Sequence, residues 1–481
     1  MKMEDNTLDS IPLYEKRIPI VPRTVHGKFR NFKTGVLVLA YSVFFLLPWL
    51  RWHRENGIPQ AVVFDVMGRR FYIFDLIIYP QNVFWLALLL FIAATFLFFA
   101  TTLIGRAFCG YFCFQTLWTD TFMFVEKWVQ GERPARLKLI KQPWNAEKIL
   151  KLGATHFIWL LISFWTALTF VLYFGYAPDL VHRFFIGQAN STAYFTVLAL
   201  TLSTYAAAGF MREQICAYIC PYGRFQSVMY EPATLAIAYD YHRGEGKEGR
   251  VPMKGDLKSL ETRHAQGHGD CIDCGICVQV CPAGIDIRDG LQYRCISCGL
   301  CIDGCNEVMS SVGFPRGLIR YDSEYNIESG SPKPPHLSWK RLKVLGYLVV
   351  LIGMSTLLVV SVLHQTDMVD SVQQIRQPLF VEMSNGEIRN RYEVRLTNES
   401  DADAVYQIST PDLPAGALDL GVMQTVRVHS GESILVDVGV SLEPDQIAKH
   451  HKFNFVIKSL TNPKDDVEVI PSNFSSELSA S

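Results

Sequence analysis

The sequence of 481 residues has little charge and almost no net charge. Charged residues make up 19% of the chain, the formal net charge is −1 and the mean hydropathy is +0.15. A soluble globular chain usually carries about 25% charged residues, so the deficit excludes a disordered chain and favours membrane spans. The balanced charge creates no overall field that would attract nucleic acid, and nucleic acid is not an expected partner.

The chain also lacks isolated cysteines. All twelve fall in Cys-x2-Cys or Cys-x3-Cys spacings, and none lies in the C-terminal tail after residue 364. The repeated spacing makes cysteines that serve only as small buried residues a less favoured interpretation. The spacings therefore point to metal or redox chemistry.

Five stretches are apolar and long enough to cross a bilayer, which takes about 20 residues: Thr34–Leu50, Asn82–Ile104, Ala154–Tyr173, Asn190–Phe210 and Lys343–His364. The bulky residues Pro48 to Arg51 do not form a signal-peptidase site, so the first stretch is interpreted as a retained span. Segments 1–33 and 106–153 carry seven and eight Lys/Arg. The positive-inside rule therefore places both in the cytoplasm, residues 211–342 with them, and the tail outside. A re-entrant first or weakest span would invert this topology.

Two cysteine runs of identical spacing lie between the fourth and fifth spans: Cys271, Cys274, Cys277 and Cys281, then Cys295, Cys298, Cys301 and Cys305. Each reads Cys-x2-Cys-x2-Cys-x3-Cys, and in two-cluster ferredoxins the fourth Cys of each run ligates the other cluster. Carried over, one [4Fe–4S] cluster takes Cys271, Cys274, Cys277 and Cys305, and the second takes Cys281, Cys295, Cys298 and Cys301. Zinc bound by four cysteines is the alternative, although zinc needs no such triple spacing. Two adjacent clusters predict transfer of single electrons.

The other four cysteines form an internal repeat, each unit following two spans: Cys109-Gly-Tyr-Phe-Cys113 and Cys216-Ala-Tyr-Ile-Cys220. We call Cys109, Cys113, Cys216 and Cys220 the rim cysteines. If the helices continue, each pair shares one helix face. Soft thiolates favour Cu(I), zinc or iron–sulfur iron, a dithiol can also cycle through a disulfide, and simple packing is the remaining alternative. Tyr111 and Tyr218 are expected to lie at the membrane interface.

Three stretches carry a family resemblance: Arg106–Asp120, Cys216–Gln226 and Gly269–Tyr321. On these motifs the chain resembles the cytochrome c oxidase accessory protein family, the CcoG/FixG/RdxA type. The resemblance implies a multi-pass protein of the bacterial cytoplasmic membrane that reduces Cu(II) to Cu(I) for assembly of a cbb3-type cytochrome c oxidase. Copper would be its substrate or bound metal, with the rim cysteines as the catalytic and copper-binding residues. Phe114 replaces the proline that follows the family's first Cys-x3-Cys motif, which leaves the geometry of that site open.

Two other functions remain open. The chain could pass quinol electrons to a periplasmic reductase, or it could act as a non-enzymatic oxidase assembly scaffold. Expected partners are the lipid bilayer, a cytoplasmic electron donor that the sequence does not identify, and copper-delivery or oxidase assembly proteins. A homo-oligomer is left open.

The predicted fold class is a multi-domain membrane protein. A helical bundle of about five spans carries an inserted two-cluster ferredoxin-like α+β domain and a C-terminal Ig-like β-sandwich. The domains are a cytoplasmic segment 1–33, a four-span domain 34–240, a linker and ferredoxin domain 241–342, a fifth span 343–364 and a periplasmic Ig-like domain 365–481.

Shorter segments carry further expectations. Residues 61–74 predict a hairpin around Met67, and residues 115–152 an amphipathic surface helix followed by a basic loop. The sandwich rests on seven strand-like runs in the tail: Leu379–Met383, Ile388–Thr397, Ala404–Ser409, Met423–Val428, Ser433–Val440, Lys452–Ser459 and Val467–Ile470.

Overall fold

The computed structural model describes residues 20–54, 58–68, 70–78, 82–330, 339–363, 371–375, 378–384, 386–398, 403–421, 425–429, 431–447, 449–461 and 467–476. Residues 1–19 of the predicted N-terminal segment, His364 at the predicted end of the fifth span and Met423 at a predicted strand start lie outside these ranges. The chain divides into two compact units, the first holding most residues up to Met354 and the second the tail with most of the segment 51–85.

Within the described residues, five helices are long and apolar enough to cross a membrane, as predicted. They are α1 (Lys28–Leu46) with its 3-10 continuation η1 (Leu47–Trp49), α2 (Val83–Ile104), α6 (Ala146–Leu172), α8 (Ser191–Thr204) with its π-helical continuation η3 (Tyr205–Met211), and α15 (Leu342–Leu363). Helices α1 and α6 begin earlier than predicted because polar contacts stabilise their first turns. The backbone N–H of Arg30 in α1 donates to Asp303 Oδ2 at 2.8 Å, and the Asn145 side chain caps α6 by accepting from the Lys148 N–H.

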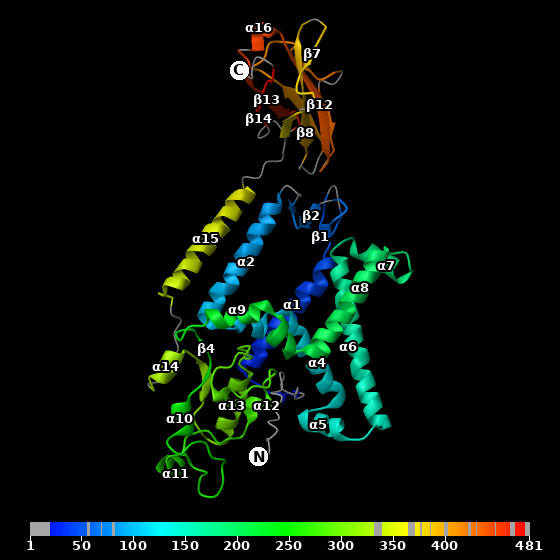
Figure 1. Cartoon of the computed structure of the whole chain (residues 1–481). Helices are drawn as coiled ribbons and strands as arrows, with labels where there is room; N and C mark the ends of the chain where they lie inside the picture. The colour runs from blue at the N-terminus through cyan, green and yellow to red at the C-terminus, as the bar shows by residue number, and fades with distance from the viewer. Residues whose placement is uncertain are drawn as a thin grey trace, which may run out of the picture. The chain divides into compact units, whose positions relative to one another are not determined.

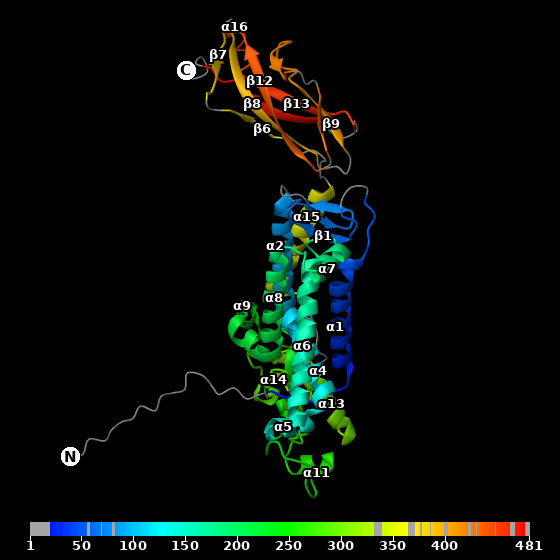
Figure 2. The same ribbon diagram turned by 90° about the vertical axis from the view of Figure 1, so that its right-hand side faces the viewer.

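Helix α6 packs against α8 and against α4 (Phe114–Gln130), and α1 runs beside α6 (Figures 1 and 2). The buried face of α4 includes Phe122, whose ring stacks on Trp159 of α6 with centroids 5.0 Å apart. The prediction of a basic loop after this helix was wrong. Residues Arg133–Lys141 form helix α5, because Arg136 is buried in an ion pair with Glu126 of α4.

Short elements build the cysteine-rich region that follows α8. They are η4 (Ile215–Ile219), α9 (Pro221–Met229), β4 (Ala236–Tyr239), α10 (Tyr241–Glu245), α11 (Leu260–Ala265), α12 (Ile276–Gln279), η5 (Ile287–Asp289), α13 (Leu300–Ser311), β5 (Ile319–Asp322) and α14 (Glu324–Glu328). Strands β4 and β5 pair antiparallel. A shared core joins them to four of the predicted cluster cysteines, Cys271, Cys277, Cys295 and Cys305.

Three strands follow α1: β1 (Val62–Asp65), β2 (Arg70–Ile73) and β3 (Leu76–Ile78). Strands β1 and β2 flank the predicted turn at Met67, and the antiparallel partner β3 of strand β2 was not predicted. A short helix, α7 (Ala177–Phe185), connects α6 with α8.

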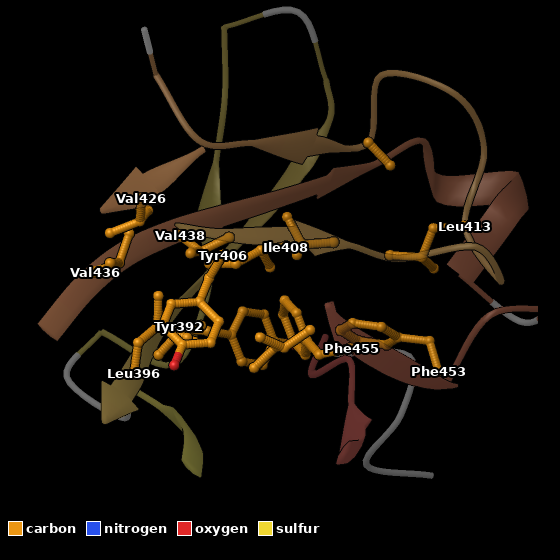
Figure 3. Close-up of a cluster of buried hydrophobic side chains, with 14 of the residues drawn as sticks. Tyr392, Leu396, Tyr406, Ile408, Leu413, Val426, Val436, Val438, Phe453 and Phe455 are labelled. Atoms are coloured by element: carbon orange, nitrogen blue, oxygen red, sulfur yellow. The ribbon is translucent and has the colours of Figure 1, made fainter. Parts of the chain in front are cut away.

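The tail folds into a β-sandwich, as predicted. One sheet has the order β10-β12-β8-β6 with β7 also on β8, and the other has the order β11-β9-β13-β14. The strands are β6 (Ser371–Gln374), β7 (Val381–Glu382), β8 (Ile388–Thr397), β9 (Ala404–Ser409), β10 (Leu418–Asp419), β11 (Val426–Val428), β12 (Ser433–Leu442), β13 (Lys452–Ser459) and β14 (Val467–Asn473), with helix α16 (Pro444–Ile447) before β13. Alternate residues of β8 and β13 fill the core, where Tyr392, Tyr406 and Phe455 are buried (Figure 3).

Candidate functional site

The two Cys-x2-Cys-x2-Cys runs adopt the same unusual backbone. Asp273 and Ser297, each just before the second Cys of its run, have φ of 50° and 51°. Gly275 and Gly299, just after that Cys, have φ of 64° and 73°. Left-handed residues in such turns aim successive backbone N–H groups into one concave nest, which suits the anionic surface of an iron–sulfur cluster. Each glycine then starts a helix, α12 or α13.

The fourth cysteine in each run has cysteines of the other run as neighbours. The pKa of the Cys305 thiol is raised to about 12, chiefly by burial and then by its neighbours Cys277, Cys271 and Cys274, all from the other run. Burial likewise raises the pKa of Cys281 to about 12, and here the neighbours are Cys298 and Cys295. The structure thus brings each fourth thiol beside the other run.

These eight residues fit two iron–sulfur clusters. The first three cysteines of each run surround a left-handed turn that forms a nest of backbone N–H groups. The fourth cysteine of each run lies near the cysteines of the other run. No three His, Cys, Asp or Glu side chains of the described ranges are set to hold a single metal ion. A four-iron cluster uses its thiolates differently, because each binds a separate iron corner. When bound, such clusters supply single-electron transfer.

The rim cysteines do not lie on continuous helices, which corrects the expected shared helix face. Cys109 lies in the short helix α3 (Ala107–Tyr111) and Cys216 in the π-helical turn η4. Cys113 and Cys220 are extended and form the N-caps of α4 and α9. Each unit is thus a helical turn, one extended cysteine and a new helix.

The replacement of proline by Phe114 leaves this backbone unchanged. Cys113 has φ −67° and ψ 129°, and Cys220, which precedes Pro221, has φ −70° and ψ 114°. Phe114 stacks on Trp118 one turn later, with centroids 4.0 Å apart. The backbone is therefore the same at the second cysteine of both repeats, whereas the turn before it is α-helical in the first and π-helical in the second.

The thiols of the two repeats are neighbours. Burial raises the pKa of Cys109 to about 12, with Cys113 and Cys216 contributing, and that of Cys216 to about 11, with Cys113 and Cys220 contributing. The Cys109 thiol donates to the buried Gln226 Oε1 over 3.4 Å. Protonated thiols at neutral pH must release protons when they bind a metal ion.

The first repeat packs directly on the second cysteine run. A Cβ on Gly110 would lie 2.7 Å from the Ile296 carbonyl oxygen and 3.0 Å from the Cys298 Cα, so only glycine fits there. The Tyr111 hydroxyl donates to the Cys298 carbonyl over 2.9 Å and its side chain is buried. The prediction of Tyr111 as an interface residue was wrong, whereas Tyr218 is 49% exposed.

Arg106 links both repeats to the ferredoxin region. Its guanidinium donates to the Tyr293 carbonyl over 2.6 Å and to the Gly223 carbonyl of α9, and it lies over the Tyr293 ring. The Tyr293 hydroxyl donates to the Ala217 carbonyl between the second pair of cysteines. A small cavity of about 40 Å³ adjoins Cys216 and is lined partly by basic side chains, Lys33, Arg106, Arg212 and Arg294.

Sequence reasoning missed Gly110, Gln226, Tyr293 and the docking role of Tyr111. One signal was present: Gly110 and Ala217 occupy equivalent positions in the repeat and differ. Gln226 contacts Cys109 from 117 residues away in the sequence, and Tyr293 contacts Ala217 from 76 residues away. No local spacing reveals such contacts.

Fold and site together define a multi-pass membrane protein with an iron–sulfur dicluster domain and a C-terminal Ig-like domain. The model of the 4Fe-4S dicluster domain matches residues 211–324, and the model described as the IG-like fold at the C-terminal of FixG, putative oxidoreductase, matches residues 358–477. These matches confirm the predicted fold class.

The particular family follows from the relatives. The chain is 42% identical to Protein RdxB of Cereibacter sphaeroides over 413 residues, which cover 85% of each chain. It is 42% identical to Protein RdxA of the same organism over 405 residues, or 83% of this chain and 84% of the relative. It is 38% identical to Nitrogen fixation protein FixG of Rhizobium meliloti over 466 residues, or 91% of this chain and 86% of the relative. The chain belongs to the FixG/RdxA family.

Proposed function

We propose that this protein is a cupric reductase that receives electrons through two [4Fe–4S] clusters, reduces Cu(II) to Cu(I) at the rim cysteines and supplies Cu(I) for assembly of a cbb3-type cytochrome c oxidase. One cluster is held by Cys271, Cys274, Cys277 and Cys305, and the other, the rim-side cluster, by Cys281, Cys295, Cys298 and Cys301. Membership in the FixG/RdxA family supports an iron–sulfur redox protein, and copper as substrate is our inference.

One observation carries this proposal: the first dithiol turn lies against a ligand of the rim-side cluster. Gly110 lets the turn approach the Ile296–Cys298 backbone, and Tyr111 fixes the contact by its hydrogen bond to the Cys298 carbonyl. This contact gives electrons a short path from the dicluster domain to the rim.

The rim thiols supply the copper chemistry. Soft thiolates bind Cu(I) in preference to Cu(II), so they favour the reduced ion and draw the electron toward copper. Each step moves one electron to one Cu(II), and each thiol that binds releases its proton. Arg106, beside Cys109, Cys216 and Cys295, favours the thiolate forms.

The wider assignments belong to the same proposal. We place the N-terminus and the dicluster domain in the cytoplasm, because segments 1–33 and 106–153 are basic, and the Ig-like domain in the periplasm. The Ig-like domain then serves as a docking module for copper-delivery or oxidase assembly proteins.

The experiment compares purified full-length protein with two variants, Cys216→Ser/Cys220→Ser and the control Ile219→Ser. Ile219 lies in the same turn and is 59% exposed, so its substitution tests the turn without removing a thiol. The protein is first reduced with dithionite, excess dithionite is removed, and Cu(II) is then added. We expect Cu(II) reduction to fall to the background of protein-free solution in the double variant and to persist in the control. Iron content and the EPR spectrum of the clusters must match those of the wild-type protein in both variants. Unchanged reduction by the double variant would remove the second dithiol from the chemistry.

A further inference from the structure

A cavity of about 460 Å³ lies between α1, α4 and the ferredoxin region. Ligand pockets for small organic molecules typically have volumes of about 300–1,000 Å³. Its lining passes from polar residues near His26 and Arg30 to Leu37 and Tyr41, which lie well inside the first apolar span. One end therefore suits a polar group and the other an apolar chain held in the bilayer.

The polar end contains a buried carboxylate with one oxygen unused. The Oδ1 of Asp120 accepts from Arg30 Nη1 at 2.9 Å and from Lys33 Nζ at 3.3 Å. Its Oδ2 is buried without a hydrogen-bond partner, and the Asp120 side chain is only 4% exposed. Because Asp120 lines the cavity, a ligand with an O–H group could satisfy this oxygen.

The cavity also touches residues beside the rim-side cluster. Val280 and Pro282 flank Cys281, and Leu300 precedes Cys301; all three line the cavity. Helix α13, which begins at Leu300, packs against α1 (Figure 1). A redox-active ring in the cavity would lie next to two predicted ligands of one cluster.

We propose that this cavity binds a membrane-soluble hydroquinone, which is the electron donor of the protein. The hydroxyl of the ring donates to Asp120 Oδ2, and the apolar tail leaves past Leu37 and Tyr41. Basic residues also line the cavity, and two of them, Arg30 and Lys127, are paired with Asp120 and Glu132. An anionic lipid headgroup would fit less well than a hydroquinone, because the unpartnered carboxylate oxygen repels phosphate and accepts a phenolic hydrogen bond. This inference rests on the proposed function in one respect only, namely that the electrons finally reach copper at the rim cysteines.

The redox step balances with two clusters as acceptors. One hydroquinone is oxidised to the quinone: its two O–H bonds break, two protons leave, and two electrons pass, one to each cluster. Both protons are released to water, and His26, which lines the cavity, is exposed. Two clusters held by these eight cysteines would store the two electrons for two Cu(II) ions, so a one-electron reaction at the rim would be matched to a two-electron donor.

The test uses full-length protein in nanodiscs under anaerobic conditions, with decylubiquinol and menadiol as probes. The blocking variant is Asn31→Trp, at an exposed cavity-lining position of α1, and the matched control is Leu39→Trp, at an exposed α1 position outside the lining. We expect hydroquinone to bleach the visible absorption of the clusters in wild type and in the control. In the blocking variant the rate falls about tenfold or more. Dithionite must still reduce both clusters in each variant, which shows that each is folded and loaded.

A second readout does not depend on the clusters. A photoreactive azidoquinone should label peptides from α1 and α4, excess quinone should protect them, and Asn31→Trp should lower the labelling. The inference would be overturned if neither hydroquinone reduced the wild-type protein. Equal rates in the two tryptophan variants, or labelling elsewhere in the chain, would overturn it as well. If copper reduction with dithionite persisted in that case, the proposed function would stand and only the donor would be wrong.

Discussion

The two dithiol repeats have one backbone design and two different surroundings. In both, a helical turn ends at an extended cysteine that caps the next helix. The first repeat has Gly110 and the buried Tyr111, both against the second cysteine run. The second repeat has Ala217, and its Tyr218 and Ile219 are 49% and 59% exposed. The two repeats thus share their thiols and differ in their neighbours.

This difference suggests a division of labour between the repeats. The first repeat packs against the dicluster domain, a position suited to accepting electrons from it. The second lies in a π-helical turn, a feature that occurs frequently at functional sites. Just before it, Arg212 has φ of 40°, a strained value for a residue other than glycine. We therefore expect copper to reach the second repeat first.

The largest expected effect is that of pH on Cu(I) binding by each repeat alone, in the variants Cys109→Ser/Cys113→Ser and Cys216→Ser/Cys220→Ser. The pKa values of Cys216 and Cys109, raised to about 11 and about 12, keep both thiols protonated at neutral pH. Since binding releases these protons, the affinity should rise about tenfold per pH unit for each such thiol below its pKa. Competition with a chromogenic Cu(I) chelator measures it. An affinity independent of pH in one variant would show that its remaining raised thiol is not a ligand.

The next effect comes from exchanging the small residues of the repeats. Gly110→Ala places a methyl group against the Ile296 and Cys298 backbone, and such overpacking costs about 1–3 kcal/mol. We expect the rate of copper reduction by protein with reduced clusters to fall about tenfold. The matched variant Ala217→Gly should change this rate less than about twofold, because it adds no atoms. Equal losses in both would remove the asymmetry between the repeats.

The tyrosines give a third, smaller contrast. Tyr111→Phe leaves the buried Cys298 carbonyl without this hydrogen bond, at a cost of about 1–2 kcal/mol. Tyr218→Phe removes an exposed contact with Arg294 of 3.2 Å and should cost less than about 0.5 kcal/mol. Thermal loss of the visible iron–sulfur absorption should shift to lower temperature in the first variant only. A similar shift in both would mean that Tyr111 does not hold the dicluster domain.

The sequence predicted what depends on local pattern. Hydropathy located five apolar helices, alternation gave strands β8, β9 and β13 with their bounds, and spacing singled out all twelve cysteines. It did not predict the contact of Tyr111 with Cys298, which are 187 residues apart. It also left open whether the helices continue through Cys113 and Cys220. Pro221 favours a break at Cys220, but no proline marks the break at Cys113. Contacts across the fold decide these features.

The smallest effect concerns the residue after each second cysteine, where the repeats carry Phe114 and Pro221. Phe114→Pro should change stability by less than about 1 kcal/mol, because two effects oppose each other. Proline suits the first position of a helix, where the N–H has no intrahelical partner, and Cys113 is already extended, as the residue before proline prefers. The variant loses the stacking of Phe114 on Trp118, which is worth about 0.5–1.5 kcal/mol.

Phe114→Ala separates these two effects, since it loses the stacking without gaining the rigid ring. Proline at a compatible position stabilises by about 0.4–1 kcal/mol through the unfolded chain. Phe114→Pro should therefore exceed Phe114→Ala in stability by about that amount, measured as the thermal midpoint of each variant. A proline variant less stable than the alanine variant would show that the first repeat needs a backbone that proline forbids. The two repeats would then differ in their geometry as well as in their surroundings.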